Sequence, residues 1–217
     1  MRRYKRNQVE EAIVRTLGAK DARVDELRFR LKRLLVTDRR LGCDAESDEE
    51  GDRHYAFYSE DQPGSGVEVR YSGYEAFALS VGLMLLEHGL PQATVVKLMR
   101  EVRRPLEAAH GESLKKDWNT LFDERAVLEQ AEPGMIAVNN TDPIFLAFVR
   151  LSDSVIGDRN RGSDVAVCRG RQELGAFFRR HSEPGVVMTF FELVGRIHVM
   201  AMNLLQIPPS KRGRGAT

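Results

Sequence analysis

Basic side chains that could bind phosphate groups and nucleic-acid bases are concentrated near the two ends of this 217-residue chain. Between residues 1 and 42 the basic residues clearly outnumber the acidic ones, and the final segment, PPSKRGRGAT, is basic again. The segment CDAESDEEGD, which starts at Cys43, reverses the sign, so the whole chain carries a formal net charge of only +1. A balanced total charge with basic ends favours a nucleic-acid partner over non-specific association.

The densest group of basic residues lies in the second of two short predicted helices. Arginine side chains on a helix that enters the major groove can read guanine edges, while neighbouring cations contact phosphates and set the register. The commoner interpretation of such a run is a solvated helix face, and that alternative stays open. The residues predicted to contact double-stranded DNA are Arg2, Arg3, Lys5, Arg6, Arg28, Arg30, Lys32, Arg33, Arg39, Arg40, Arg70, Lys211, Arg212 and Arg214.

No arrangement typical of catalysis or metal binding is evident. The five histidines stand at no metal-ligand spacing with one another or with a cysteine, and the acidic segment that starts at Asp44 has Glu49 where a calcium loop needs glycine. A nucleophile elbow, a P-loop and a dinucleotide fingerprint are also absent from the sequence. We therefore predict no catalytic residue, no metal site and no cofactor, and we do not expect an enzyme.

The two cysteines and the most apolar segment bear on where the protein works. Cys43 and Cys168 are far apart and lie in no partner motif, so a disulfide scaffold is not expected and a reducing cytoplasm fits. The segment VVMTFFELVGRIHVMAMNLLQI contains Glu192, Arg196 and His198. Since charges inside a membrane span are costly, this pattern favours a buried helix over a membrane anchor.

Hydrophobic periodicity predicts the elements that would position the basic side chains. Apolar residues at helical spacing indicate helices over residues 6–17 and 24–35, followed by an acidic loop over residues 44–52. Alternating segments over residues 54–59 and 67–71, separated by a glycine-rich turn at 61–66, predict a strand hairpin. Further helices are predicted over residues 74–88, 90–102 and 112–130.

The second half of the chain has a mixed pattern. Strands are predicted over residues 135–138, 144–151 and 165–168, and helices over residues 172–180 and 187–205. The expected fold is mainly α with an α+β C-terminal part. The predicted divisions are a winged-helix DNA-binding domain at 1–105, a helical connector that could dimerise at 106–132, an α+β domain at 133–207 and a basic disordered tail at 208–217.

The order helix, helix, hairpin and then YSGYEAFALSVGLMLLEHGLPQATVVKLMREV resembles the winged-helix reader of the MerR family of bacterial transcription regulators. The resemblance covers roughly Tyr4 to Val102, where Tyr74-Glu75, the leucines between 79 and 86, Gly89 and Thr94 stand at matching places. The chain departs from that pattern in the longer link before its second helix and in the acidic loop before the hairpin. The resemblance implies DNA binding and homodimerisation.

Two function hypotheses follow from the sequence. In the first, the protein is a sequence-specific transcriptional regulator that binds DNA as a homodimer, with a C-terminal half that dimerises, senses a small-molecule effector or binds a protein partner. In the second, it is a protein-interaction adaptor that does not bind DNA, and its basic helices are merely solvated. We expect no membrane partner under either hypothesis.

Overall fold

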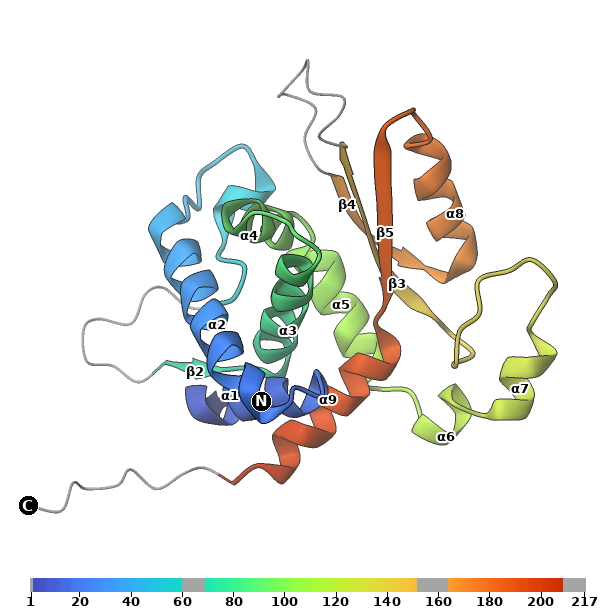
Figure 1. Cartoon of the computed structure of the whole chain (residues 1–217), viewed down its shortest axis with the longest axis horizontal. Coiled ribbons are helices and arrows are strands. Elements are labelled where there is room, and N and C mark those ends of the chain that lie inside the picture. The colour runs from blue at the N-terminus through green and yellow to red at the C-terminus, as the bar shows by residue number, and fades with distance from the viewer. Residues whose placement is uncertain (1, 60–68, 152–163, 209–217) are drawn as a thin grey trace, which may run out of the picture. The chain divides into compact units, whose positions relative to one another are not determined.

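The computed structural model describes residues 2–59, 69–151 and 164–208 (Figure 1). The chain divides into two compact units, and each is described by itself here. Unit 1 comprises residues 1–99 together with residues 199–217, and unit 2 comprises residues 100–198. Among the described residues no helix has both the length and the apolar character needed to cross a membrane.

Unit 1 is built from helices and one short pair of strands. The strands β1 (Tyr4–Lys5) and β2 (Arg70–Tyr71) pair antiparallel, with Tyr4 opposite Tyr71. The helices are α1 (Arg6–Thr16), α2 (Asp21–Leu41), the 3-10 helix η1 (Glu50–Arg53), α3 (Gly73–Glu87), most of α4 (Gln92–Glu101) and the C-terminal part of α9 (Val194–Gln206).

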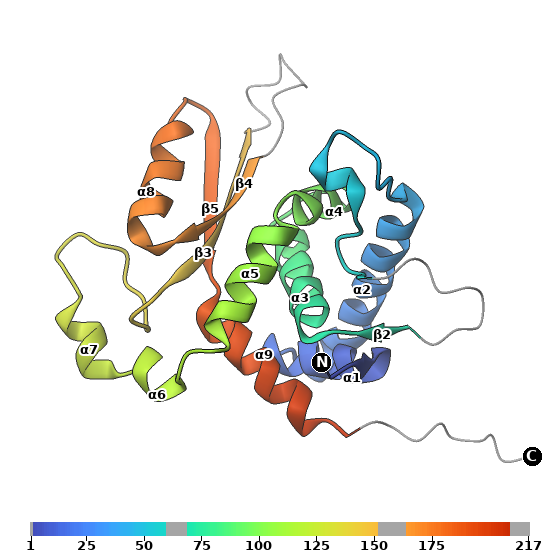
Figure 2. The same ribbon diagram turned by 180° about the vertical axis from the view of Figure 1, so that it is seen from behind.

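Helix α3 is the central helix of unit 1. It begins with a capping box, in which the Ser72 hydroxyl accepts from the Glu75 amide at 3.1 Å and the Glu75 carboxylate accepts from the Ser72 amide at 2.6 Å. Every residue from Tyr74 to Leu85 is buried, so both apolar stripes of the sequence face protein. The helix packs against α1 and α2, as the two opposite views show (Figures 1 and 2).

The end of the described chain returns to α1. The Gln8 side-chain amide donates to the Ile207 carbonyl at 2.8 Å, and the Asn203 amide donates to the Thr16 hydroxyl at 3.0 Å. These two bonds join the two ends of α1 to α9 and to the residue that follows it. Residues almost two hundred positions apart in the sequence therefore belong to one compact unit.

The predicted hairpin is wrong in its first strand. Residues 54–59 form an irregular segment, and β2 pairs with β1 instead. Four consecutive residues of this segment are buried: Tyr55, Ala56, Phe57 and Tyr58. Short apolar runs cannot distinguish a strand from an irregular segment that fills a core, which is why the sequence pattern misled. The predicted turn at 61–66 lies outside the described residues.

Unit 2 contains a three-stranded antiparallel sheet in the order β4-β3-β5, formed by β3 (Ile144–Leu151), β4 (Asp164–Arg169) and β5 (Val186–Glu192). Helix α8 (Gly170–Arg180) covers one face of this sheet (Figures 1 and 2). Alternate residues of β3, Phe145, Ala147 and Val149, pack there against Leu174 and Phe177. The expected fold class, mainly α with an α+β C-terminal part, is confirmed.

Several predicted boundaries in unit 2 are wrong. The helix predicted over residues 112–130 is divided among the end of α5 (Arg103–Ser113), α6 (Trp118–Leu121) and α7 (Glu124–Glu129). Asp117 and Asp123 accept from the amides of Thr120 and Ala126, so each begins a new short helix. Residues 135–138 form no strand. Residues 187–192, which were predicted to begin a helix, pair with β3 and belong to β5.

The close approach of α3 to residues 54–59 yields the first prediction. A Cβ atom at Gly82 would lie 3.0 Å from Phe57 Cζ and 3.3 Å from Leu34 Cδ1, both in fully buried side chains. Gly82→Ala should therefore lower the free energy of unfolding by about 1–2 kcal/mol despite the better helix propensity of alanine. Gly111→Ala in α5 meets no atom within 4 Å and should raise it by about 0.5 kcal/mol. Urea denaturation measures both, and a stabilising Gly82→Ala would contradict the packing.

The second prediction concerns pH. His110 in α5 is 5% exposed, and its burial, together with the neighbouring His198, lowers the pKa of the imidazole from 6.5 to about 4. The imidazole of the unfolded chain is protonated below about pH 6.5, whereas that of the folded protein stays neutral down to about pH 4. The free energy of unfolding is therefore highest above pH 6.5 and falls as the pH is lowered toward 4. The loss should reach about 3 kcal/mol. Denaturation from pH 7 to pH 4 should show this slope, and His110→Gln should flatten it; an equal slope in the variant would exclude His110 as the cause.

Candidate nucleic-acid interface

Helix α2 has two chemically different faces. Its inner face carries Leu27, Leu31, Leu34, Leu35 and Asp38, all buried. We call the opposite side the outer face of α2; it consists of Arg28, Phe29, Lys32, Arg33, Val36 and Arg40, which recur at spacings of three and four residues and are all exposed. The helix is longer than the predicted 24–35, so Arg39 and Arg40 also belong to it.

Two apolar side chains interrupt the basic outer face. Phe29 is 59% exposed and Val36 is 54% exposed. The Arg33 guanidinium lies 5.7 Å from the centre of the Phe29 ring, close enough for a cation–π contact. Sequence reasoning picked out the cations of α2 but missed these two residues, although their spacing from Lys32 and Arg33 already placed them on the same side of a helix.

The ion pairs on α2 are weak ones. Arg28 lies 3.5 Å from the Asp25 carboxylate and 4.0 Å from that of Glu10, and Arg30 pairs with Glu26 at 2.5 Å. Exposed pairs of this kind contribute little to stability because water screens them. Lys32 pairs with no carboxylate of the described residues. The cations of the outer face are therefore available to an anionic partner.

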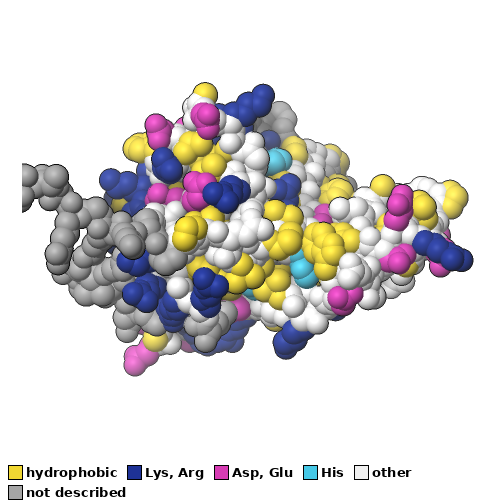
Figure 3. Space-filling view, turned by 90° about the horizontal axis from the view of Figure 1, so that it is seen from below, with side chains coloured by type: hydrophobic (Ala, Val, Ile, Leu, Met, Phe, Trp, Pro, Cys, Tyr) yellow, Lys and Arg dark blue, Asp and Glu magenta, His cyan; other side chains and the backbone are white. Residues whose placement is uncertain are grey.

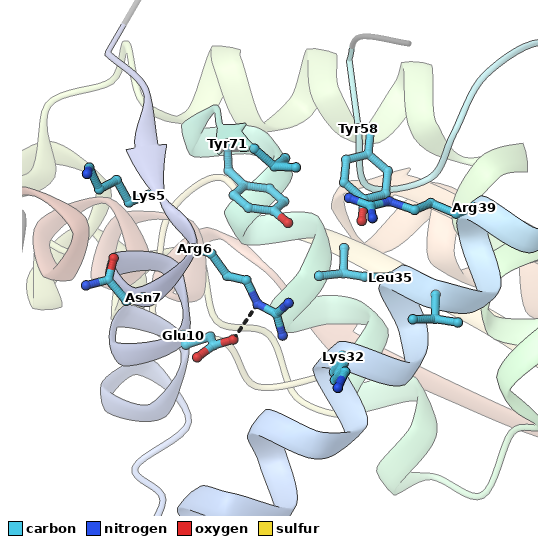
Figure 4. Close-up of a pocket in the computed structure, with 11 residues that line it drawn as sticks. Lys5, Arg6, Asn7, Glu10, Lys32, Leu35, Arg39, Tyr58 and Tyr71 are labelled. Atoms are coloured by element: carbon cyan, nitrogen blue, oxygen red, sulfur yellow. Dashed lines mark hydrogen bonds and ion pairs between the residues drawn. The ribbon is translucent and has the colours of Figure 1, made fainter. Parts of the chain in front are cut away.

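A groove of about 600 Å³ lies beside this face (Figure 4). We call it the α1–α2 groove, since its walls come from the start of α1, from α2, from β2 and from Tyr58. Among the described residues that line it, the cations are Lys5, Arg6, Lys32 and Arg39, and the one carboxylate is Glu10. Glu10 accepts from Arg6 Nε at 2.7 Å, which leaves the groove with an excess of positive charge.

Two tyrosines and an arginine form the deep wall of the groove. The Arg39 guanidinium lies 5.0 Å from the centre of the Tyr58 ring, and the Tyr58 and Tyr71 rings lie 6.0 Å apart. Burial raises the pKa of both phenols, so their hydroxyls stay protonated. Arg39 Nε and the Tyr58 hydroxyl are buried and make no hydrogen bond of normal geometry to the described residues, but the Tyr58 and Tyr71 hydroxyls lie close enough to influence each other's pKa.

Asp38 places Tyr58 in this wall. The Asp38 carboxylate, which is fully buried on the inner face of α2, accepts from the amides of Ala56 at 3.1 Å and Phe57 at 3.0 Å. The Ser59 hydroxyl donates to the Glu75 carboxylate at 2.5 Å. These bonds hold residues 56–59 between α2 and α3 without a strand ladder, and the Tyr58 side chain then reaches the groove.

No family model, curated protein or solved structure matches this chain. Within the described residues, moreover, histidine, cysteine and acidic side chains form no group of three or more that could hold a metal ion.

The structure gathers part of the predicted DNA-binding set. Lys5, Arg6, Lys32 and Arg39 line the groove, and Arg28, Arg33 and Arg40 join Lys32 on the outer face of α2. Arg3 donates from Nη1 to the Arg70 carbonyl at 3.3 Å, and the Arg2 guanidinium lies 5.6 Å from the Tyr4 ring centre, so both stay beside the β1–β2 pair. Arg30 is turned toward Glu26. Lys211, Arg212 and Arg214 lie outside the described residues.

Basic side chains are concentrated on one part of the surface, but acidic side chains lie among them. In the space-filling view from below, Lys and Arg side chains gather on the left part of the face, with Asp and Glu side chains among them (Figure 3). Arg6, Arg28 and Arg30 each have such a carboxylate neighbour. The interface is therefore a set of cations around α2 and its groove, and not a continuous basic surface.

Asp38 yields the third prediction. Asp38→Ala removes the acceptor from two buried amides, so we expect the free energy of unfolding to fall by about 3 kcal/mol. Asp25→Ala is the matched control, because Asp25 has a 97% exposed side chain on the same helix and should cost less than about 0.5 kcal/mol. Denaturation midpoints compare the two. Equal midpoints for the two variants would show that the amides of Ala56 and Phe57 do not depend on Asp38.

Proposed function

We propose that the protein is a sequence-specific, DNA-binding transcriptional regulator, and that the outer face of α2 in unit 1 is its reading surface. The observation that carries this proposal is the composition of that face. Its cations and its two exposed apolar side chains alternate at helical spacing over about three turns. Phe29 and Val36 lie exposed between these cations and give the face an apolar component that cations alone would not supply.

The side chains of the outer face suit direct readout in the major groove. Arg28 and Arg33 carry guanidinium groups that can donate two parallel hydrogen bonds to the O6 and N7 atoms of guanine. Phe29 and Val36 can contact the methyl group of thymine, which is an apolar feature of that groove. A face with both kinds of side chain can distinguish base pairs, whereas cations alone bind any sequence.

The flanking cations support phosphate contacts. Arg2, Arg3 and Arg70 stand together at the β1–β2 pair, and Arg6 begins the neighbouring helix α1. Contacts of these residues with the DNA backbone would fix the position of α2 along the duplex without reading the base sequence. The resemblance to MerR-type regulators stays a prediction, and the hairpin that formed part of it is absent from the described residues, because residues 54–59 form no strand and β2 pairs with β1.

The proposal includes a homodimer that is formed or regulated through unit 2. Strand β5 pairs only with β3 among the described residues, so one of its edges is free. Val187 and Met188 on this strand are 38% and 41% exposed. An edge strand with exposed apolar side chains favours pairing with a second copy. A twofold dimer would bind a pseudo-palindromic site with half-sites one or more helical turns apart.

The fourth prediction tests the reading surface. Arg33→Ala should weaken binding to the specific site by about 1–3 kcal/mol and relax base preference, while Arg6→Ala should weaken all sequences alike. The control is Arg15→Ala, which removes the same charge from the far end of α1, where Arg15 pairs with Glu11. Selection of bound genomic fragments followed by titration of the selected duplex measures these effects.

The salt dependence of the same titration provides a second check. With about six phosphate contacts, the affinity should fall on the order of a thousandfold between 50 and 200 mM salt. If the wild-type protein shifts no genomic fragment at micromolar concentration and low salt, DNA binding is refuted and the adaptor hypothesis takes its place.

A further inference from the structure

Two buried polar atoms at the α1–α2 groove make no hydrogen bond of normal geometry to the described residues, although the Tyr71 hydroxyl lies close enough to one of them to affect its pKa. They are Arg39 Nε and the Tyr58 hydroxyl, and both are shielded from water. Tyr58 is only 7% exposed, yet it lines the groove, and Figure 4 shows its hydroxyl beside the Arg39 guanidinium. A buried donor without a partner costs stability, so it is normally paired. A group that enters the groove can supply the missing partner.

The side chains of the groove favour a ligand that carries negative charge and accepts hydrogen bonds. Lysine, arginine and protonated phenol groups are all donors, and Lys5, Arg6, Lys32 and Arg39 supply four positive charges around the groove. Among the described residues that line it, the one carboxylate, on Glu10, is already engaged by Arg6. The first turn of α1, which begins at the groove, contains no acidic residue, and the positive end of the helix dipole therefore adds to the attraction.

We infer that the α1–α2 groove binds a phosphate group, with Arg39 and Tyr58 as its specific donors and Lys5, Arg6 and Lys32 as its surrounding charge. A phosphate presents several acceptor oxygens to converging donors, and arginine matches its geometry with paired hydrogen bonds. A groove of about 600 Å³ also has room for the sugar or organic group to which the phosphate is attached.

Two sources can supply this phosphate. The DNA backbone is one source, and this arm rests on the proposed function. Lys32 and Val36 belong both to the outer face of α2 and to the wall of the groove, so a duplex bound to α2 brings its backbone to the groove. A free phosphorylated small molecule is the other source, and it requires no DNA binding by the protein.

The test uses the full-length protein and three variants. Tyr58→Phe deletes only a buried hydroxyl that makes no hydrogen bond of normal geometry, so its denaturation midpoint should stay close to that of the wild type. Arg39→Gln removes the guanidinium, and Arg15→Gln removes one positive charge from α1 outside the groove. The probes are inorganic phosphate, AMP and a 12-base-pair duplex of mixed sequence, each titrated at constant ionic strength. Thermal stabilisation by phosphate or AMP reports their binding, since a ligand of the folded state raises its melting temperature.

We expect Tyr58→Phe and Arg39→Gln each to weaken phosphate and AMP binding about tenfold, as for loss of a hydrogen bond to a charged group, and Arg15→Gln to leave it unchanged. An equal loss for the duplex assigns the phosphate to the DNA backbone. If the variants weaken phosphate and AMP binding but leave duplex affinity unchanged, the phosphate belongs to a free phosphorylated ligand. The same assignment follows if the wild-type protein does not bind the duplex. Absence of duplex binding also refutes the proposed function, but it does not affect the inference that the groove binds phosphate.

Wild-type affinity of Tyr58→Phe for all three probes would overturn the inference. Equal weakening by Arg39→Gln and Arg15→Gln would also overturn it, because it would show that general charge and not the groove binds the anion. Phosphate stabilises many proteins without binding a site, and the comparison with Arg15→Gln and with Tyr58→Phe removes this background.

Discussion

The arrangement of unit 1 depends on one buried carboxylate. Asp38 is fully enclosed on the inner face of α2, where it accepts the backbone amides of Ala56 and Phe57. These amides belong to an irregular segment, so no strand partner is present to satisfy them. A buried amide without an acceptor is costly, and the carboxylate therefore determines where residues 55–58 can lie. The positions of Phe57 in the core and of Tyr58 in the groove both follow from this contact.

Phe57 transmits the constraint to the centre of the unit. Its ring fills the space that a side chain at position 82 would need, so α3 approaches α2 closely at Gly82. The glycine weakens the helix intrinsically, but it permits the contact between α3, Leu34 and Phe57. The capping box of Ser72 and Glu75 starts the same helix, and Glu75 also binds Ser59. Residues 56–59 of the irregular segment are thus held by a carboxylate from α2 and a carboxylate from α3.

Helix α2 contributes to the core of unit 1 and also presents the proposed recognition surface. The inner face of α2 holds the core leucines and Asp38, while its outer face presents arginines, Lys32 and two exposed apolar side chains. Substitutions on the outer face should leave the fold intact because their ion pairs are exposed and weak. At the groove, stability and ligand binding make opposite demands. Tyr58 and Arg39 each bury a polar atom that makes no hydrogen bond of normal geometry to the described residues, and this lowers stability. Such a feature is expected at a site that a ligand completes.

The sequence by itself determined the elements whose pattern is local. The bounds of helices α1, α3 and α4 and of strand β3 were predicted to within a few residues. Each of these elements has a run of apolar residues, periodic or continuous, that is long enough to be recognised within the element itself. It also determined that Lys32 and Arg33 share a helix with the leucines of the core. Only the tertiary structure decided that β2 pairs with β1, that residues 54–59 form no strand, and that residues 187–192 join a sheet and do not begin a helix. The groove likewise joins Arg6, Arg39 and Tyr58, which are separated by tens of residues. These outcomes depend on which distant groups satisfy buried amides and apolar surface, and no pattern within a short stretch of chain contains that information.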